Sequence, residues 1–146
     1  GVDHRRLMLA GSLPSRADVK ALERVADVYL DTFPFSGSIS VIDPLELGIP
    51  TVVWEGRTHR GRMAAALLRE ISMSELIVQN EADYIGLAAS LAMDVSRRHT
   101  ISGRIRAAMA QRPRFVDASA YARELGAMLE SLVAGERQPL PAAAVA

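Results

Sequence analysis

The residues most suited to chemistry lie in one short stretch, where a strand-like run gives way to a helical one. Residues 32–40 read Thr-Phe-Pro-Phe-Ser-Gly-Ser-Ile-Ser. Gly37 lets the backbone approach a ligand closely, and Ser38 and Ser40 add hydroxyl donors to the free amides of the helix start. Because a helix amino terminus carries about half a positive charge, it favours a bound diphosphate. Asp43, one turn further on, has a carboxylate that could accept hydrogen bonds from a ribose diol.

The same residues also have a purely structural interpretation. Ser40 would cap the helix, and Asp43 would complete a capping box, as happens at many helix starts. Taken alone, the residue types favour this structural interpretation and leave the binding interpretation open.

Basic side chains in the neighbouring loops are further candidates. Ligands of parallel α/β sheets bind at the carboxyl ends of the strands, so the loops of interest are 11–16, 32–40 and 55–61. Arg16 and Arg62 lie at the ends of two of these loops and are candidate crevice contacts. Arg62 could equally tie its loop to a carboxylate of its own domain. For His59 and Arg60 we favour an exposed polar loop.

No catalytic set is recognisable. His4 and His99 have no partners at metal-ligand or triad spacing and are interpreted as surface residues. No pair of carboxylates suits a hydrolase, and no Gly-rich P-loop is present. The catalytic residues therefore stay unknown, and no metal site is predicted.

Strand and helix patterns alternate four times along the chain. Apolar and β-branched runs predict strands at residues 6–10, 28–32, 51–54 and 76–78. Helices are predicted from Ser15, over 38–47, over 63–71, from Asn80, over 97–111 and along the apolar stripe of 121–132. This order predicts an α/β fold, a Rossmann-like parallel sheet with flanking helices, ending in α-helices. Residues 1–135 are expected to form one domain and the Pro/Ala-rich residues 136–146 a disordered tail.

Composition excludes several classes of protein. The 17 basic residues balance the 17 acidic ones, so neither nucleic acid nor an anionic membrane is an expected partner. The absence of cysteine excludes disulfides and thiolate chemistry. No signal peptide and no apolar run of about 20 residues is visible, so we expect a cytoplasmic protein without a membrane span. The chain starts without Met, directly before a strand-like run, and is interpreted as a piece of a longer protein.

The order of short motifs resembles that of a known enzyme family. The donor-binding stretch of the O-GlcNAc transferase/SPINDLY-like glycosyltransferases is similar to residues 26–56, ADVYLDTFPFSGSISVIDPLELGIPTVVWEG. The Pro-Phe before Gly and the Ile-Asp are also similar to related bacterial N-glycosyltransferases. Further along, the chain keeps the family's Gly-x-Thr, an Arg before a small-residue helix and a Glu-Leu-Ile strand. The resemblance covers about residues 7–130 and implies the carboxy-terminal, nucleotide-sugar-binding half of a GT-B enzyme.

The resemblance also implies roles for residues. Ser38, Ile39 and Ser40, beside Gly37, would surround the donor diphosphate, and Asp43 would bind the ribose. Arg62 matches an Arg common in the family.

The implied activity is inverting transfer of a sugar to Ser or Thr side chains of a protein acceptor. The implied donor is a nucleotide-diphosphate sugar, N-acetylglucosamine or a hexose on UDP, with no metal or other cofactor. In the family, a Lys on the diphosphate and the proposed acceptor-side base come from the upstream part of the enzyme. The 146 residues of this chain alone are therefore expected to be catalytically inactive.

Departures from the family pattern support an alternative. The family usually has His-Thr-Thr where this chain has Ser38, Ile39 and Ser40, and its O-GlcNAc transferases carry a His at the position of Val19. Pro44, inside the predicted helix, is a further departure. The alternative is a non-catalytic, degenerate α/β module that acts as a scaffold or interaction domain.

The family's strand order, 3-2-1-4-5-6, has a consequence for the sheet. Residues 6–10 would form the third strand and 28–32 the fourth, with two upstream strands between them. We therefore expect strand 6–10 either to move beside strand 28–32, or the open edges to pair elsewhere.

Overall fold

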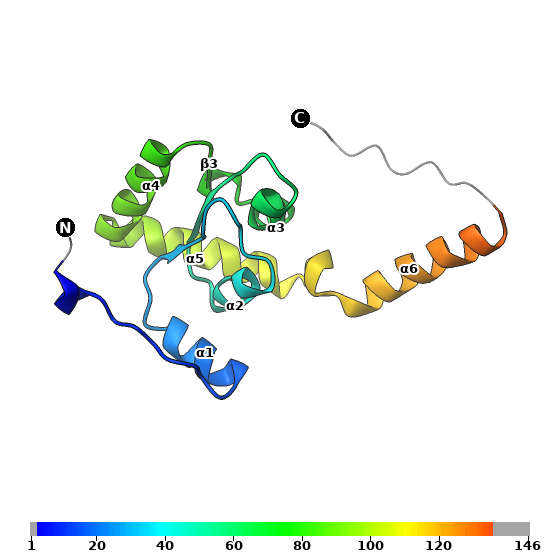
Figure 1. Cartoon of the computed structure of the whole chain (residues 1–146), viewed down its shortest axis with the longest axis horizontal. Helices are drawn as coiled ribbons and strands as arrows, with labels where there is room; N and C mark the ends of the chain where they lie inside the picture. Colours follow the sequence, from blue (N-terminus) through cyan, green and yellow to red (C-terminus); the bar gives the residue numbers. More distant parts are fainter. Residues whose placement is uncertain (1–2, 136–146) are drawn as a thin grey trace. The chain divides into compact units, whose positions relative to one another are not determined.

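The computed structural model describes residues 3–135 and divides the chain into two compact units, up to Gln111 and from Arg112. The division falls within the range expected to form one domain, and those domain boundaries stay a prediction. The larger unit holds two helices before the second strand and three after it (Figure 1). Its elements are η1 (His4–Arg6), α1 (Arg16–Glu23), β1 (Tyr29–Leu30), α2 (Ile39–Leu47), β2 (Thr51–Trp54), η2 (Arg60–Arg62), α3 (Met63–Glu70), η3 (Ser74–Leu76), β3 (Ile77–Val78), α4 (Glu81–Met93) and α5 (Val95–Ala110).

The sheet has three parallel strands in the order β1-β2-β3. Tyr29 of β1 lies opposite Thr51 of β2, and Val53 of β2 lies opposite Ile77 of β3. The central strand is buried on both sides, as a run of β-branched residues in a parallel sheet should be. The parallel sheet with flanking helices confirms the predicted fold class.

Apolar faces of the helices cover the sheet. Helices α2, α3 and α4 contact β2, α5 packs on α2 and α4, and α1 packs on α2. The shared core consists of side chains with no exposed surface, namely Val41, Leu45, Val52, Val53, Ala64, Ala65, Leu68, Leu76, Leu91 and Ile105.

Local capping signals set the helix boundaries. Ser15 begins α1, since its Oγ accepts a hydrogen bond from the amide of Asp18 at 3.3 Å, as its spacing predicts. Gly48 ends α2 in the left-handed conformation, with φ of 76°. Helix α5 begins two residues before the predicted 97–111, because the Asp94 carboxylate caps it by accepting from the Arg97 amide at 2.9 Å.

The strand predicted at residues 6–10 is wrong. His4–Arg6 form a single 3-10 turn, started by the Asp3 side chain, which accepts from the Arg5 amide at 3.0 Å. The residues that follow form no strand, and the Leu9 side chain is 93% exposed. An apolar run becomes a buried strand only beside a partner, and β1 pairs with β2 alone within residues 3–135.

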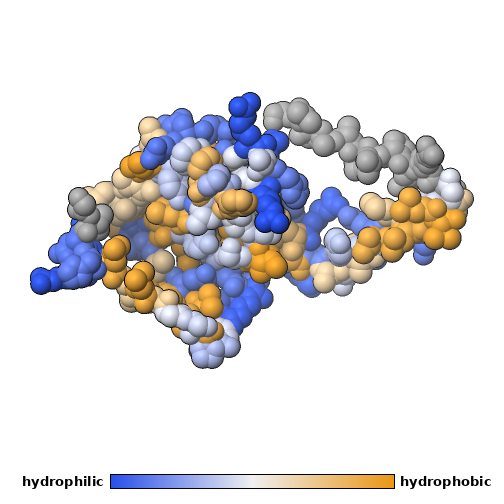
Figure 2. All heavy atoms as spheres, viewed as in Figure 1, coloured by the Kyte–Doolittle hydropathy of each residue, from blue (hydrophilic) through white to orange (hydrophobic). Residues whose placement is uncertain are grey.

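The second unit contains η4 (Arg114–Val116) and α6 (Ala118–Val133). The Asp117 carboxylate caps α6 by accepting from the amides of Ser119 and Ala120, and Gly135 follows with φ of 77°. The predicted stripe is helical, but its apolar side chains are exposed (Figure 2). The tail predicted at 136–146 lies outside the described residues. None of the helices within residues 3–135 is both long and apolar enough to cross a membrane.

The core predicts a sharp contrast between two apolar substitutions. Leu45→Ala, at a position with no exposed surface, should lower the free energy of unfolding by about 2–5 kcal/mol through lost burial and a cavity. Ile85→Ala on α4, where the side chain is 59% exposed, is the control and should change it by less than about 0.5 kcal/mol. Urea unfolding measures both, and equal effects would contradict this core.

Candidate functional site

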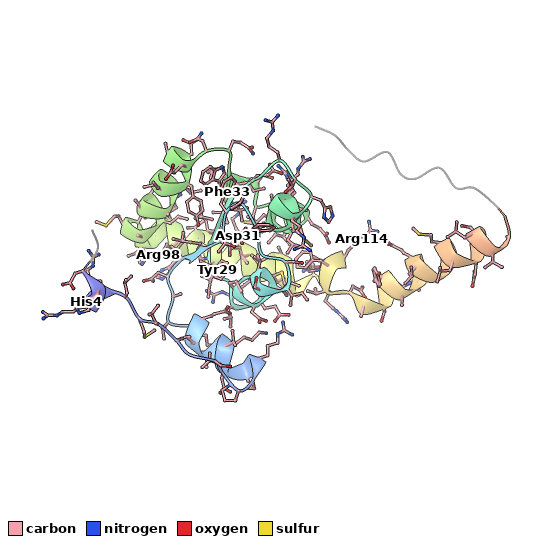
Figure 3. The ribbon with its side chains drawn as sticks, in the orientation of Figure 1. His4, Tyr29, Asp31, Phe33, Arg98 and Arg114 are labelled. Atoms are coloured by element: carbon pink, nitrogen blue, oxygen red, sulfur yellow. The ribbon has the colours of Figure 1, made fainter. Side chains whose placement is uncertain are left out.

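The carboxylate of Asp31 organises the loop between β1 and α2. Asp31 follows β1 directly and is buried, with 4% of its surface exposed. Its Oδ1 accepts from the Gly37 amide and its Oδ2 from the Ser36 hydroxyl, both at 2.7 Å. Figure 3 shows Asp31 between Tyr29 and Phe33, at the centre of the larger unit. One carboxylate therefore fixes the turn that leads into α2.

Ser36 joins this loop to the next helix. While its hydroxyl donates to Asp31, its Oγ accepts from the Ala64 amide in the first turn of α3 at 3.0 Å. The starts of α2 and α3 are thereby tied together at the carboxyl end of the sheet.

Gly37 is required where it stands. A Cβ there would lie 2.7 Å from both Ser40 Oγ and Val41 Cγ2 and 3.0 Å from Asp31 Oδ1, closer than real side chains approach. Any larger residue would have to displace the side chains of Ser40 and Val41 in the first turn of α2.

Aromatic packing supports the other side of the loop. Phe33 stacks on Trp54 with ring centroids 3.7 Å apart, and Trp54 contacts Tyr84 in a tilted arrangement at 6.4 Å. The Tyr84 hydroxyl donates to the carbonyl oxygen of Asp31 at 2.7 Å. Burial raises the pKa of Tyr84, so this phenol keeps its donor proton at neutral pH.

An open pocket of about 490 Å³ lies beside the start of α2. It is lined by Ser38 and by residues of the loop after β2 and of α3, namely Arg57, His59, Arg62, Met63, Ala66 and Leu67. The structure therefore brings the predicted site residues Ser38 and Arg62 together. It also places His59, which we interpreted as part of an exposed polar loop, on the pocket wall.

Helix α2 begins without a side-chain cap. Ser38 is the N-cap residue but its hydroxyl accepts no capping hydrogen bond, and Ser40 lies inside the helix. The capping box of Ser40 and Asp43 is therefore not formed. The first amides of a helix have no partner within it, so those of Ile39 and Ser40 are available at the helix start.

Arg62 also ties its loop to a carboxylate of its own domain, which was the structural alternative for this residue. Its Nε lies 3.3 Å from Glu55 Oε1, and Glu55 is buried at the end of β2. Arg69 donates to both oxygens of Glu55, at 2.8 and 2.7 Å, and Gln79 donates to Oε2 at 2.9 Å. The hydrogen bonds from Arg69 are the main cause that lowers the pKa of Glu55 to about 2, against the opposing effect of burial.

Asp43 and Arg16 meet on the α1 side of α2. Arg16 Nε and Nη2 donate to Asp43 Oδ1 at 2.8 and 2.5 Å, and Lys20 Nζ lies 3.5 Å from the same oxygen. Lys20 also pairs with Glu46. Burial opposes ionisation of Asp43, but Arg16 and then Lys20 outweigh it and lower the pKa of the carboxyl. All of these contacts use Oδ1, and Oδ2 has no hydrogen-bond partner among residues 3–135.

Sequence reasoning missed the residues that hold the site in place. Asp31, Ser36 and Glu55 carry its buried hydrogen bonds, and Arg57 adds a cation to its wall. An acidic residue at the end of each of two neighbouring strands was the available signal. Within residues 3–135, no three His, Asp or Glu side chains are grouped as metal ligands, and the expectation of no cofactor stays a prediction.

Comparison with known proteins gives consistent matches. The sequence pattern of glycosyl transferase family 41 matches residues 1–125. A probable UDP-N-acetylglucosamine–peptide N-acetylglucosaminyltransferase SPINDLY from Petunia hybrida is 27% identical over 132 residues, which are 90% of this chain and 14% of the relative. The protein of the same name from Oryza sativa subsp. japonica is 32% identical over 87 residues, 60% of this chain and 9% of the relative.

A solved structure agrees with these sequence matches. A mutant O-GlcNAc transferase from Thermobaculum terrenum matches with a TM-score of 0.79 and 30% identity, over 87% of this chain and 24% of that chain. This chain thus spans less than a quarter of the length of each of these proteins.

The hydrogen bonds that Arg62, Arg69 and Gln79 donate to Glu55 predict a pH-dependent loss of stability. In the folded protein the pKa of Glu55 is about 2, below its ordinary value of 4.5. The ionised Glu55 therefore stabilises the fold fully above pH 4.5, and this stabilisation is lost as the pH falls towards 2. Glu55→Gln should therefore cost on the order of 3 kcal/mol at pH 7 and progressively less below pH 4.5. Chemical unfolding at several pH values measures this, with exposed Glu81→Gln as the control. A cost that did not shrink in acid would show that Glu55 acts through packing instead.

Proposed function

Because the chain belongs to glycosyl transferase family 41, we propose that the pocket at the start of α2 binds the diphosphate of a nucleotide-sugar donor. One observation carries this proposal: the uncapped start of α2 opens on a pocket whose wall includes Arg57, His59 and Arg62. Helix dipole, free amides and guanidinium groups all favour an anion at the same place.

In this arrangement the phosphoryl oxygens accept hydrogen bonds from the amides of Ile39 and Ser40 and from the Ser38 hydroxyl. Gly37 lets the loop pack closely on Asp31 and on the first turn of α2, which holds these donors in place. Arg57 supplies the main charge, since it has no hydrogen bond or ion pair with any residue in 3–135. Arg62 contributes the end of its guanidinium, because its Nε is held by Glu55.

Asp43 binds the ribose in the same proposal. Arg16 and Lys20 hold Oδ1, which keeps the carboxylate ionised and leaves Oδ2 to accept from a sugar hydroxyl. Arg16 thus acts at the crevice as a positioning residue for Asp43.

The chemistry that this site supports is stabilisation of the leaving diphosphate during inverting transfer. Negative charge grows on that group as the bond to the sugar breaks, and fixed donors at the α2 start stabilise it. Names of the relatives specify UDP-N-acetylglucosamine as donor and a peptide as acceptor. We propose a donor of this kind, N-acetylglucosamine or a hexose on UDP, transferred to Ser or Thr of a protein without a metal ion. The base that activates the acceptor belongs to the other half of the enzyme, and the Lys on the diphosphate to an earlier part of the same half.

The alternative function is a non-catalytic module that kept the fold. Its support is that Ser38, Ile39 and Ser40 replace the family's His-Thr-Thr and that Asp43 is engaged by α1. Titrating the intact protein with uridine and guanosine diphosphates distinguishes the two. Saturable binding of one nucleotide supports the donor site, and binding of neither supports the module.

Arg57 is the sharpest test of the phosphate contacts. Arg57→Gln should weaken binding of the nucleoside diphosphate by about 1.5–3 kcal/mol, the value of a hydrogen bond to a charged group. Arg60→Gln is the matched control, because it removes an exposed cation from the same loop that does not line the pocket. If calorimetry gave both variants the wild-type affinity, the proposal that the diphosphate binds in this pocket would be wrong.

Asp43 tests the ribose contact separately. Asp43→Ala should weaken nucleoside diphosphate binding by about 1–3 kcal/mol. The parallel measurement is the melting temperature, because the substitution also breaks the contact with Arg16. If the melting temperature fell while the affinity stayed unchanged, Asp43 would serve only to join α1 to α2.

A further inference from the structure

A second pocket lies at the opposite end of the strands from the start of α2. Its volume is about 290 Å³, and it is bordered by residues 26–27 before β1, by residues 48–50 before β2, and by side chains of α5. Nothing in the proposed donor site reaches this end of the sheet.

Positive charge dominates this second pocket. Arg24, Arg98 and Arg106 line it together with His99, whereas Asp27 is the only acidic residue on its wall. The pocket therefore has an excess of guanidinium groups over carboxylates in a chain whose formal net charge is zero.

The guanidinium group of Arg98, labelled in Figure 3, is held in place on the wall of this pocket. Its side chain is 12% exposed, and its Nη1 donates to the carbonyl oxygens of Leu91 and Ala92 at 2.8 and 2.7 Å, at the end of α4. Its Nη2 lies 3.3 Å from Asp27 Oδ1, but that carboxylate is 74% exposed and only weakly neutralises it.

Arg106 is held by close packing on Gly48. A Cβ at Gly48 would lie 2.6 Å from both Cγ and Nε of Arg106, so the arginine stem lies directly over the glycine. The Arg106 guanidinium donates to the Ser102 hydroxyl, a neutral partner. Within residues 3–135, the Arg106 guanidinium makes no hydrogen bond to the last carbonyls of α2, of which those of Leu45 and Pro44 accept from the amides of Gly48 and Ile49.

The Arg24 side chain has no hydrogen bond or ion pair with any residue in the described part of the chain, although its backbone amide caps α1 by donating to the Lys20 carbonyl at 3.1 Å. The side-chain donors of Arg24, and those of Arg106 that Ser102 does not use, have no acceptor among residues 3–135, and the one carboxylate on the pocket wall, Asp27, is paired with Arg98. Planar guanidinium groups donate paired hydrogen bonds to the oxygens of phosphates and of carboxylates. A phosphate monoester, with a charge of about −1.5 to −2 at neutral pH, balances this excess of arginine better than a single carboxylate does.

From this juxtaposition we propose that Arg24, Arg98 and Arg106 form a second anion site, which binds a phosphate monoester. The ligand is either a free phosphate compound or the phosphate headgroup of a lipid, since both present the same group. This site is separate from the proposed donor pocket and needs none of its residues.

Inorganic phosphate is the first probe. Calorimetric titration of the intact protein carrying Arg57→Gln, which weakens the proposed donor pocket, should show saturable binding at millimolar phosphate. Arg24→Gln and Arg106→Gln should each weaken that binding about tenfold. Arg123→Gln on α6 is the control and should have no effect.

Vesicles distinguish the source of the phosphate. Sedimentation with phosphatidylcholine vesicles, with and without phosphatidic acid, shows whether a headgroup binds more tightly than free phosphate and whether Arg24→Gln removes the difference. The Arg24 side chain makes no hydrogen bond or ion pair within residues 3–135, and Arg24→Gln keeps the backbone amide that caps α1, so this variant stays informative if Arg106→Gln unfolds the protein. Absence of both kinds of binding, or phosphate binding unaffected by Arg24→Gln in a folded protein, would overturn the second site.

Discussion

The larger unit depends on how one buried carboxylate is satisfied. Asp31 directly follows β1, and burying its carboxyl group, in a residue that is 4% exposed, would be unfavourable without hydrogen bonds. The Gly37 amide and the Ser36 hydroxyl supply them, and Ser36 passes the constraint on to α3. Because the same residue also holds Tyr84 through its carbonyl oxygen, three helices are positioned by one strand end. A site at the carboxyl end of the sheet is therefore held in place by these hydrogen bonds, and not by the exposed loop.

Arginine is used in two ways around this frame. At Glu55 and Asp43, guanidinium groups neutralise carboxylates that folding removes from water, and the lowered pKa of each carboxyl reflects that pairing. At Arg57 and Arg24, the charge has no protein partner within residues 3–135. The contrast separates arginines that complete the fold from the two arginines that we propose bind anions.

Most of the fold was predictable because its signals are local. The cap at Ser15, the stop at Gly48 and the β-branched run of β2 act within a few residues, so the sequence pattern determines them. The prediction of a strand at residues 6–10 was wrong because a strand needs a neighbouring strand to pair with, and an apolar run does not indicate whether one is present. At the site, the start of α2 and the position of Arg62 were predictable. The partners of Asp43 were not, because Arg16 lies 27 residues away and its approach depends on how α1 packs on α2.

The order of the strands has a consequence for how the chain folds. Spatial order follows chain order from β1 to β3, so each strand adds to an edge formed by the strand just before it. These pairings join residues 22 and 24 apart in the chain, Tyr29 with Thr51 and Val53 with Ile77, and so close shorter loops than a connection that skipped a strand would. The sheet can therefore assemble in chain order, with each strand and its following helix completing the part formed before it.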